Sequence, residues 1–219
     1  MKNVFLCRMI LLTSLSLVFA FASQARETGK ESDNSSTKNV LMLGLRDNVK
    51  SNYFHKGMIT EQTGIKEDVI DMEYNIIIME NIMASANGAC NFIPTSADTH
   101  AHVHKWCNLI KVNGNGEECC SDLSTIPTDE YRNALDISEA EYLLVVNQHY
   151  LKWQSKPMRT LFHIVSYTLY DKNQNEVYRG SSYFTSMNLE HPDKLRKTSS
   201  KTSSRIASTI VNQIKLKEA

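Results

Sequence analysis

Three stretches in the C-terminal half of the chain are rich in β-branched and aromatic residues. They cover residues 141–153 (EYLLVVNQHYLKW), 161–170 (LFHIVSYTLY) and 177–184 (VYRGSSYF). This composition is typical of β-strands. The connections at 154–159 and 171–176 are short and polar, which favours hairpins. The pattern therefore predicts an antiparallel three-stranded meander.

The first half of the chain combines strand and helix patterns. A continuous apolar run at residues 40–45 (VLMLGL) predicts a strand that is covered on both faces. From residue 66 onward, apolar residues recur at helical spacing over about five turns, until Asn87-Gly88 provides a helix C-terminus. Residues 91–93, just before Pro94, supply a second short strand.

A long amphipathic helix is predicted at the C-terminus, where Pro192 is suited to a first helical position. A shorter helix, capped by Thr128, precedes the meander. The basic residues on the long helix fit a solvated face better than a surface for an anionic membrane or polymer. The order of elements predicts an α+β domain with a mostly antiparallel sheet and helices packed mainly on one face.

The N-terminus has the pattern of a secretory signal peptide. Lys2 and Arg8 precede an apolar run at residues 9–22, and small residues suited to cleavage follow, with Ala22 and Ala25 as the two candidate cleavage sites. The run is too short for a stable membrane span, so we expect no transmembrane segment after cleavage. We expect a signal peptide at 1–25, a flexible polar lead-in at 26–38 and a single α+β domain at 39–219. The mature protein would then be in the periplasm or on the extracellular side of the envelope.

The charge of the chain gives no indication of a nucleic-acid partner. Its 24 basic and 24 acidic residues balance, and removal of the signal peptide leaves 22 basic against 24 acidic residues, a formal charge of −2. We therefore expect no nucleic-acid binding.

Four cysteines remain after residue 25, namely Cys90, Cys107, Cys119 and Cys120. An even number in an oxidising compartment allows two disulfides. The adjacent pair is unlikely to bond to itself, because the resulting ring is strained, so each would need Cys90 or Cys107. A domain of this size also folds without disulfides, and both states remain open.

Residues 99–107 (THAHVHKWC) place three histidines at alternate positions. In a strand, the outer two side chains would be about 13 Å apart, too far for all three to hold one ion. In a helix, His100 and His104 stand one turn apart and form a candidate pair of metal ligands, while His102 points away. A helix also gathers four apolar residues into one stripe: Val103, Trp106, Cys107 and Ile110.

The segments EAEYLLVVNQHYL and LFHIVSYTLYDKNQNEVYRG, followed by the Ser- and Lys-rich helix, resemble parts of a family of small exported bacterial proteins. Their fold is similar to the N-terminal domain of TolB and to CsgG-like or penicillin-binding-protein-activator domains. The resemblance covers the topology of residues 39–217. It implies a cell-envelope domain that binds other proteins, and it offers no catalytic residues to carry over.

Aromatic side chains of the meander form a candidate binding surface on a sheet face not covered by helices: Tyr150, Trp153, Tyr167 and Tyr170, with Tyr178 and Tyr183 beside them. We expect a non-enzymatic binding or accessory module of the bacterial cell envelope, with another envelope protein as its partner and no cofactor. The alternative is an extracytoplasmic metal-binding protein that uses His100 and His104. The chain contains no phosphate-binding loop and no nucleophile elbow that would indicate an enzyme.

Overall fold

The computed structural model describes residues 37–86, 88–95 and 100–219. The predicted signal peptide and most of the predicted lead-in lie outside the described residues. Within the described part of the chain, no helix combines the length and the apolar character needed to cross a bilayer.

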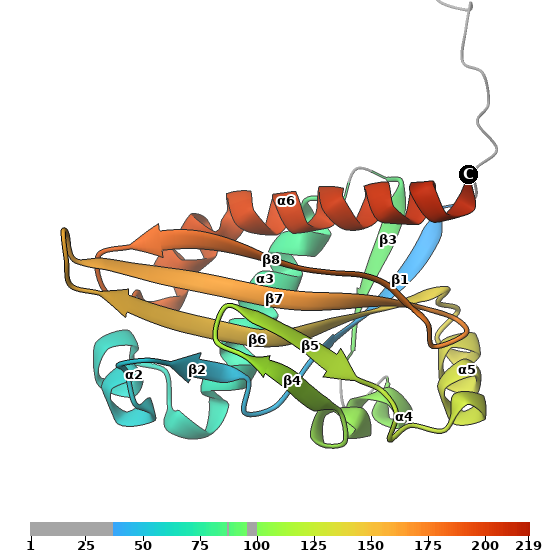
Figure 1. Ribbon diagram of the computed structural model, residues 1–219, viewed down its shortest axis with the longest axis horizontal. Coiled ribbons are helices and arrows are strands. Elements are labelled where there is room, and N and C mark those ends of the chain that lie inside the picture. The colour runs from blue at the N-terminus through green and yellow to red at the C-terminus, as the bar shows by residue number, and fades with distance from the viewer. Residues whose placement is uncertain (1–36, 87, 96–99) are drawn as a thin grey trace, which may run out of the picture. The chain divides into compact units, whose positions relative to one another are not determined.

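A six-stranded sheet forms the centre of the fold, with the order β3–β1–β6–β7–β8 and with β2 pairing to β6 (Figure 1). β1 is parallel to both β3 and β6, and β2 is also parallel to β6, whereas β6, β7 and β8 form the predicted antiparallel meander. The strands are β1 (Lys38–Gly44), β2 (Val49–Ser51), β3 (Cys90–Pro94), β6 (Tyr142–Gln154), β7 (Thr160–Asp171) and β8 (Glu176–Ser186).

The two longest helices, α3 (Ile70–Ala84) and α6 (Pro192–Glu218), pack on one face of this sheet. Isoleucines of both helices meet Met42 of β1 and Leu144 of β6 in one buried cluster. A 3₁₀ turn at Glu67–Val69 leads into α3, and the short helix α2 (Lys56–Thr63) packs beside it. The predicted α+β class, the mostly antiparallel sheet and the long C-terminal helix are confirmed.

Shorter elements cover part of the second face. They are α4 (Ala101–His104), the 3₁₀ turn η2 (Lys105–Asn108), the hairpin of β4 (Lys111–Asn115) and β5 (Glu118–Asp122), and α5 (Thr128–Ile137). Trp106 is fully buried here and stacks on Tyr131, with ring centroids 5.8 Å apart. The predicted apolar stripe around Trp106 therefore faces the core.

The hairpin and the segment containing β2 and α2 were not predicted, because their strands lack an apolar run. Gly114 and Gly116 provide the hairpin with left-handed backbone, at φ of 100° and 66°. A Cβ at Gly114 would approach the carbonyl oxygen of Glu118 to 2.3 Å, so the cross-strand pair requires glycine.

A β-bulge at Asn147 changes which side chains of β6 face the helices. Before it, Leu144 and Val146 point toward α3 and α6, and after it His149 and Leu151 do so. The buried Asn147 amide donates to Thr168 Oγ1 at 2.8 Å and to the Cys119 carbonyl at 3.0 Å. The bulge thus places His149 next to α3.

β8 lies at one end of the strand order, next to α6. Its eleven residues contain no proline. Thr202 of α6 donates its hydroxyl hydrogen to the Tyr183 carbonyl at 3.0 Å, so the helix hydrogen-bonds directly to this strand.

Candidate functional site

A cleft of about 730 Å³ opens at the carboxyl ends of β1 and β3. One wall is α3, and the opposite side contains the loop after β1 together with His104 and Cys107. Crevices outside the carboxyl ends of parallel strands are common ligand sites, because the chain diverges there and leaves backbone and loop side chains around an open space.

Most charges at the rim of the cleft are already paired. Lys56 lies 3.1 Å from Asp47 and 3.6 Å from Asp71, and the hydrogen bond to Asp47 and the charge of Asp71 raise the pKa of the lysine. Asp71 also accepts a hydrogen bond from the Val49 amide at 2.7 Å. These carboxylates therefore hold the loop and α2 in place.

The floor of the cleft contains a buried amide network centred on Asn75 of α3. Its Nδ2 donates to the Leu45 carbonyl at 2.9 Å. Its Oδ1 accepts from Asn48 Nδ2 at 3.0 Å and lies 2.9 Å from His149 Nε2. Since a carbonyl oxygen only accepts, His149 donates through Nε2. Three segments distant in the sequence are joined at this one side chain.

Two buried histidines of the meander lie close to this network. Burial, helped by the nearby His163, lowers the pKa of His149 to about 3. Burial also lowers the pKa of His163 to about 3, and its Nε2 lies 2.9 Å from Ser186 Oγ. The histidines are diagonal neighbours on β6 and β7, because Leu151 pairs with His163 and His149 with Val165. Both rings are neutral at physiological pH.

The walls of the cleft are rich in sulfur. Met72, Met79 and Met83 line it from α3. On the opposite side, Cys107 Sγ donates to the Gly44 carbonyl at 3.2 Å and lies 3.9 Å from His104 Nδ1. His104 and Cys107 lie on one helical segment, as the sequence predicts, and their i, i+3 spacing permits the contact, which was not predicted.

A second feature is the part of the meander that the β4–β5 hairpin leaves uncovered (Figure 1). Tyr150, Ile164 and Tyr183 pair across three strands and form one row on this face. Phe162 lies on the same face, with its ring centroid 6.0 Å from that of Tyr183. Tyr183 is 56% exposed, whereas Ile164 beneath the aromatic rings is buried. We call Tyr150, Phe162, Ile164 and Tyr183 the aromatic row.

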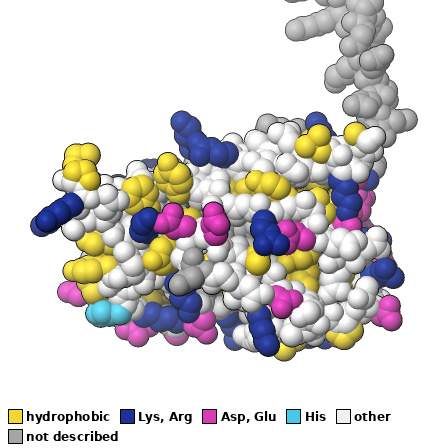
Figure 2. Space-filling view, viewed as in Figure 1, with side chains coloured by type: hydrophobic (Ala, Val, Ile, Leu, Met, Phe, Trp, Pro, Cys, Tyr) yellow, Lys and Arg dark blue, Asp and Glu magenta, His cyan; other side chains and the backbone are white. Residues whose placement is uncertain are grey.

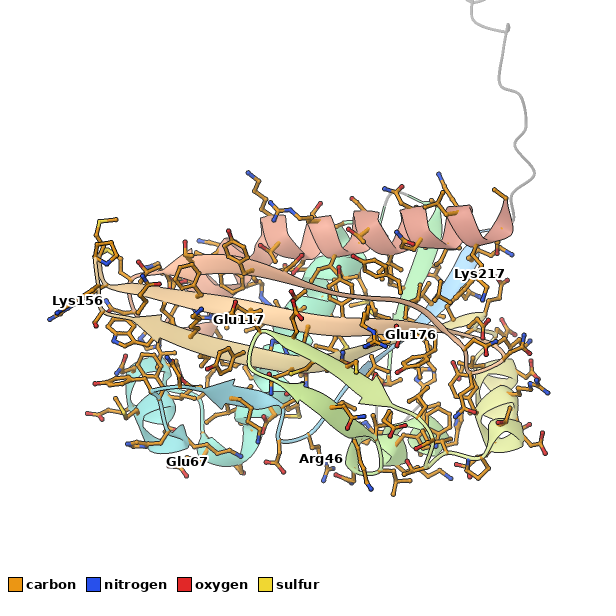
Figure 3. All side chains as sticks on the ribbon, viewed as in Figure 1. Arg46, Glu67, Glu117, Lys156, Glu176 and Lys217 are labelled. Atoms are coloured by element: carbon orange, nitrogen blue, oxygen red, sulfur yellow. The ribbon has the colours of Figure 1, made fainter. Side chains whose placement is uncertain are left out.

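Basic residues lie close to the aromatic row. Lys152, which pairs with Phe162 in the ladder, forms an ion pair with Glu117 at the tip of the β4–β5 hairpin. Lys156 and Arg159 are exposed in the β6–β7 connection, and Figure 3 shows Lys156 at the outer end of the hairpin that β6 and β7 form. In Figure 2, apolar side chains at this end of the molecule lie among lysine and arginine side chains.

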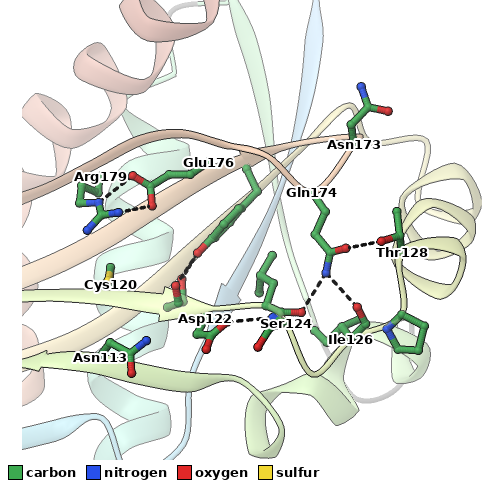
Figure 4. A pocket seen from close by; sticks show the side chains of 14 residues that line it. Asn113, Cys120, Asp122, Ser124, Ile126, Thr128, Asn173, Gln174, Glu176 and Arg179 are labelled. Atoms are coloured by element: carbon green, nitrogen blue, oxygen red, sulfur yellow. Dashed lines mark hydrogen bonds and ion pairs between the residues drawn. The ribbon is translucent and has the colours of Figure 1, made fainter.

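A shallow hollow of about 630 Å³ lies between β5, the start of α5 and the β7–β8 turn (Figure 4). Its polar groups already bond to each other. Gln174 donates to the carbonyls of Leu123 and Ile126 at 2.9 Å each and accepts from Thr128 at 2.9 Å. Glu176 pairs with Arg179 at 2.6 Å. These hydrogen bonds attach the segment between β5 and α5 to the β7–β8 turn of the meander, which accounts for the polar groups in the hollow.

Neither the scan against protein-family models nor the search of curated proteins finds a match. Among solved structures, the PelC dodecamer from Paraburkholderia phytofirmans matches at 10% identity with a TM-score of 0.38, over 78% of this chain and 87% of that one. Lipoprotein GNA1162 from Neisseria meningitidis matches at 12% identity and 0.37, over 81% and 97%. The LpoB C-terminal domain from Salmonella enterica matches at 10% and 0.32, over 75% and 90%. All three are bacterial proteins, but at these TM-scores the similarities support no conclusion about this chain.

The structure divides the aromatic residues predicted as a binding surface. Tyr150 belongs to the aromatic row, and Trp153 is half-buried and stacks on Tyr53 at 6.0 Å. Tyr167 and Tyr170 are only 2% and 5% exposed, so the prediction is wrong for these two. Tyr167 lies under α6, and the Tyr170 hydroxyl donates to the Ser121 carbonyl at 2.6 Å.

The histidine prediction is also modified by the structure. His100 directly precedes α4 and His104 is its last residue. His102, expected on the solvent side, instead contacts α5, with its Nε2 3.3 Å from both the Ala134 carbonyl and Ser138 Oγ. Among the described residues, no group of three or more His, Cys, Asp or Glu side chains is arranged to hold a metal ion.

The four cysteines of the described chain are free thiols, so the structure contains none of the disulfides considered from the sequence. Cys90, Cys107 and Cys119 are buried, and Cys120 is partly exposed. Burial raises the pKa of the thiols of Cys90, Cys107 and Cys119.

We expect Cys120 to react first with a thiol-specific maleimide in the native protein. The three buried thiols should react only after unfolding, because both their burial and their raised pKa disfavour the reactive thiolate. Mass spectrometry of native and denatured samples measures this order. If Cys120 does not react with the maleimide in the native protein until a reductant is added, this cysteine instead forms a disulfide.

Proposed function

We propose that this protein is a non-enzymatic binding or accessory module of the bacterial cell envelope, and that the aromatic row contacts a partner protein. The supporting observation is the aromatic row itself. Phe162 and Tyr183 lie on hydrogen-bonded strands beyond the β4–β5 hairpin, and the Tyr150 ring packs beside the hairpin turn at Gly116. Aromatic side chains on a preformed surface lose little entropy on binding and dominate many interfaces.

The charges around the aromatic row favour one class of partner. Lys156 and Arg159 are exposed in the adjoining loop, and Lys152 forms an ion pair with Glu117. A partner with an apolar centre and carboxylates at its rim would complement this surface. The assignment to the envelope rests on the signal-peptide pattern of residues 1–25, with its basic start and apolar run.

The proposal is tested by site-specific photo-crosslinking in the bacterium that produces the protein. A photoreactive phenylalanine analogue at position 183 should crosslink to one envelope protein. The same analogue at position 53 is the matched control, because Tyr53 is 58% exposed, close to the 56% of Tyr183, but lies outside the aromatic row. Crosslinks to a second copy of this chain, to lipid alone, or equally from both positions would overturn the proposal.

We expect Tyr183→Ala to weaken binding of the crosslinked partner at least tenfold, because central aromatic residues of interfaces often contribute about 2 kcal/mol. Lys156→Ala combined with Arg159→Ala should slow association and weaken its salt dependence. Tyr53→Ala should leave the affinity within twofold. Surface plasmon resonance at two salt concentrations measures all three, and an unchanged affinity for Tyr183→Ala contradicts the role of the row.

A further inference from the structure

Behind its acidic rim, the cleft contains several soft metal ligands, which are an imidazole, a thiol and thioethers. His104 Nδ1 and Cys107 Sγ are 3.9 Å apart, and both residues line the cavity. In the metal-free chain, Cys107 donates a hydrogen bond to the Gly44 carbonyl at 3.2 Å, and this bond is lost when the thiol binds a metal as the thiolate. The imidazole and the thiol lie on one helical segment and offer two metal ligands without movement of the backbone.

The separation of the two atoms restricts the geometry of an ion between them. Imidazole nitrogen and thiolate sulfur bind metals at about 2.0 and 2.3 Å, so an ion in contact with both would have a bond angle of about 130°. The tetrahedral angle of a structural zinc site would require a separation of about 3.5 Å. The wider angle suits a metal of low coordination number, and thiolate and thioether ligands select Cu(I).

The other residues that line the cavity also favour Cu(I) over a hard divalent cation. Met72, Met79 and Met83 present thioethers along α3, and a thioether is a soft ligand. Of the four carboxylates that line the cleft, three already form ion pairs, since Asp47 and Asp71 contact Lys56 and Glu80 contacts Arg196. Charge also favours a monovalent ion, because Cu(I) and one thiolate together are neutral, and Cys107 is only 4% exposed.

We propose that His104 and Cys107 bind one Cu(I) ion in the cleft at the carboxyl ends of β1 and β3, and that a methionine side chain of α3 reaches across the cleft as a further ligand. The pair replaces the His100 and His104 pair expected from the sequence. Binding converts the Cys107 thiol to a thiolate and releases one proton to solvent, and the copper enters and stays as Cu(I), so no electron is transferred. The proposal is independent of the aromatic row.

The test is an anaerobic titration of the purified, reduced protein with Cu(I) in competition with bicinchoninate. We expect one Cu(I) per chain and release of about one proton per ion at pH 7.5, since a cysteine binds a metal ion as the thiolate. Proton release is measured on the native chain, so it does not depend on any variant.

Cys107→Ser and His104→Gln should each weaken Cu(I) binding at least 100-fold. Cys120→Ser and His100→Gln are the matched controls and should stay within threefold of the native affinity. Replacing Met72, Met79 and Met83 in turn by leucine, which preserves side-chain volume, should weaken binding about tenfold for at least one of them. Thermal unfolding of each variant without copper verifies that it is folded.

Three results would overturn the site. They are a native protein that takes no Cu(I) from bicinchoninate, an affinity unchanged by Cys107→Ser, and an equal loss in His100→Gln and His104→Gln. A fourth result that would overturn the site is the displacement of bound Cu(I) by one equivalent of Zn(II), because the separation of the two ligands and the charge of the site favour the monovalent ion.

Discussion

Lowering the pH from 7.5 to 5 should reduce the free energy of unfolding by about 4 kcal/mol. His149 and His163 are each 3% exposed, and burial lowers the pKa of both from 6.5 to about 3. In the unfolded chain they regain the ordinary value near 6.5, so the unfolded state binds protons that the folded state rejects. Each histidine therefore contributes a loss of about 2 kcal/mol at pH 5.

The sign and the pH window follow from these values. Because the folded pKa is lower than the unfolded one, the stability is complete above about pH 6.5 and decreases as the pH falls toward 3. Burial raises the pKa of Asp171, but hydrogen bonds from Lys217 and Asn175 outweigh this and hold it below its ordinary value, so this carboxylate keeps its contribution throughout the interval from pH 7.5 to 5.

Urea unfolding at half-unit pH steps measures the effect. The double variant His149→Gln and His163→Gln should be less stable at pH 7.5 but almost independent of pH between 7.5 and 5. Native protein whose stability does not change across this interval, or a double variant with the native slope, would contradict the assignment of the effect to these two rings.

Gly44→Ala should lower the free energy of unfolding by at least about 3 kcal/mol. A Cβ at this position would lie 2.4 Å from Cγ and 2.7 Å from Cβ of Asn75. Asn75 would have to leave its place. The Leu45 carbonyl and the His149 N–H would lose this partner, and the Asn48 amide would keep only the Val146 carbonyl at 3.3 Å. Each buried polar group left unpaired costs about 1 to 3 kcal/mol.

Gly88→Ala is the control for this substitution. Gly88 has φ of 77° and no atom within 4 Å of an added Cβ, so alanine there incurs only the backbone cost of about 1 kcal/mol. Urea unfolding should therefore rank native protein first, Gly88→Ala second and Gly44→Ala last. The same stability for the two variants would show that Asn75 adapts without losing its hydrogen bonds.

The sequence allowed prediction of the elements whose apolar period is unambiguous. The meander, β1, α3 and α6 follow from β-branched runs and three- to four-residue steps, because burial against a sheet imposes those periods. The β4–β5 hairpin could not be found in this way, since Glu118, Ser121 and Asp122 interrupt its pattern and its glycines, rather than apolar residues, define it.

The site was less predictable than the fold because it depends on distant contacts. Asn75 lies 27 positions from Asn48 and 74 positions from His149, and no local pattern indicates that one carbonyl oxygen joins them. The bulge at Asn147 adds to this, since strict alternation along β6 would place His149 on the face opposite to the one it occupies. Tyr167 and Tyr170 were misassigned because the pattern did not show that α6 and β5 cover them.

The hydrogen bond from Thr202 to the Tyr183 carbonyl affects how this protein behaves at high concentration. A long end strand without proline is a template on which another chain can add a strand and start an aggregate. Because α6 already hydrogen-bonds to one carbonyl group of β8, it hinders the regular ladder that an added strand would form there. The helix thereby protects solubility, and Thr202→Val should make the protein more prone to fibril formation while leaving its fold intact.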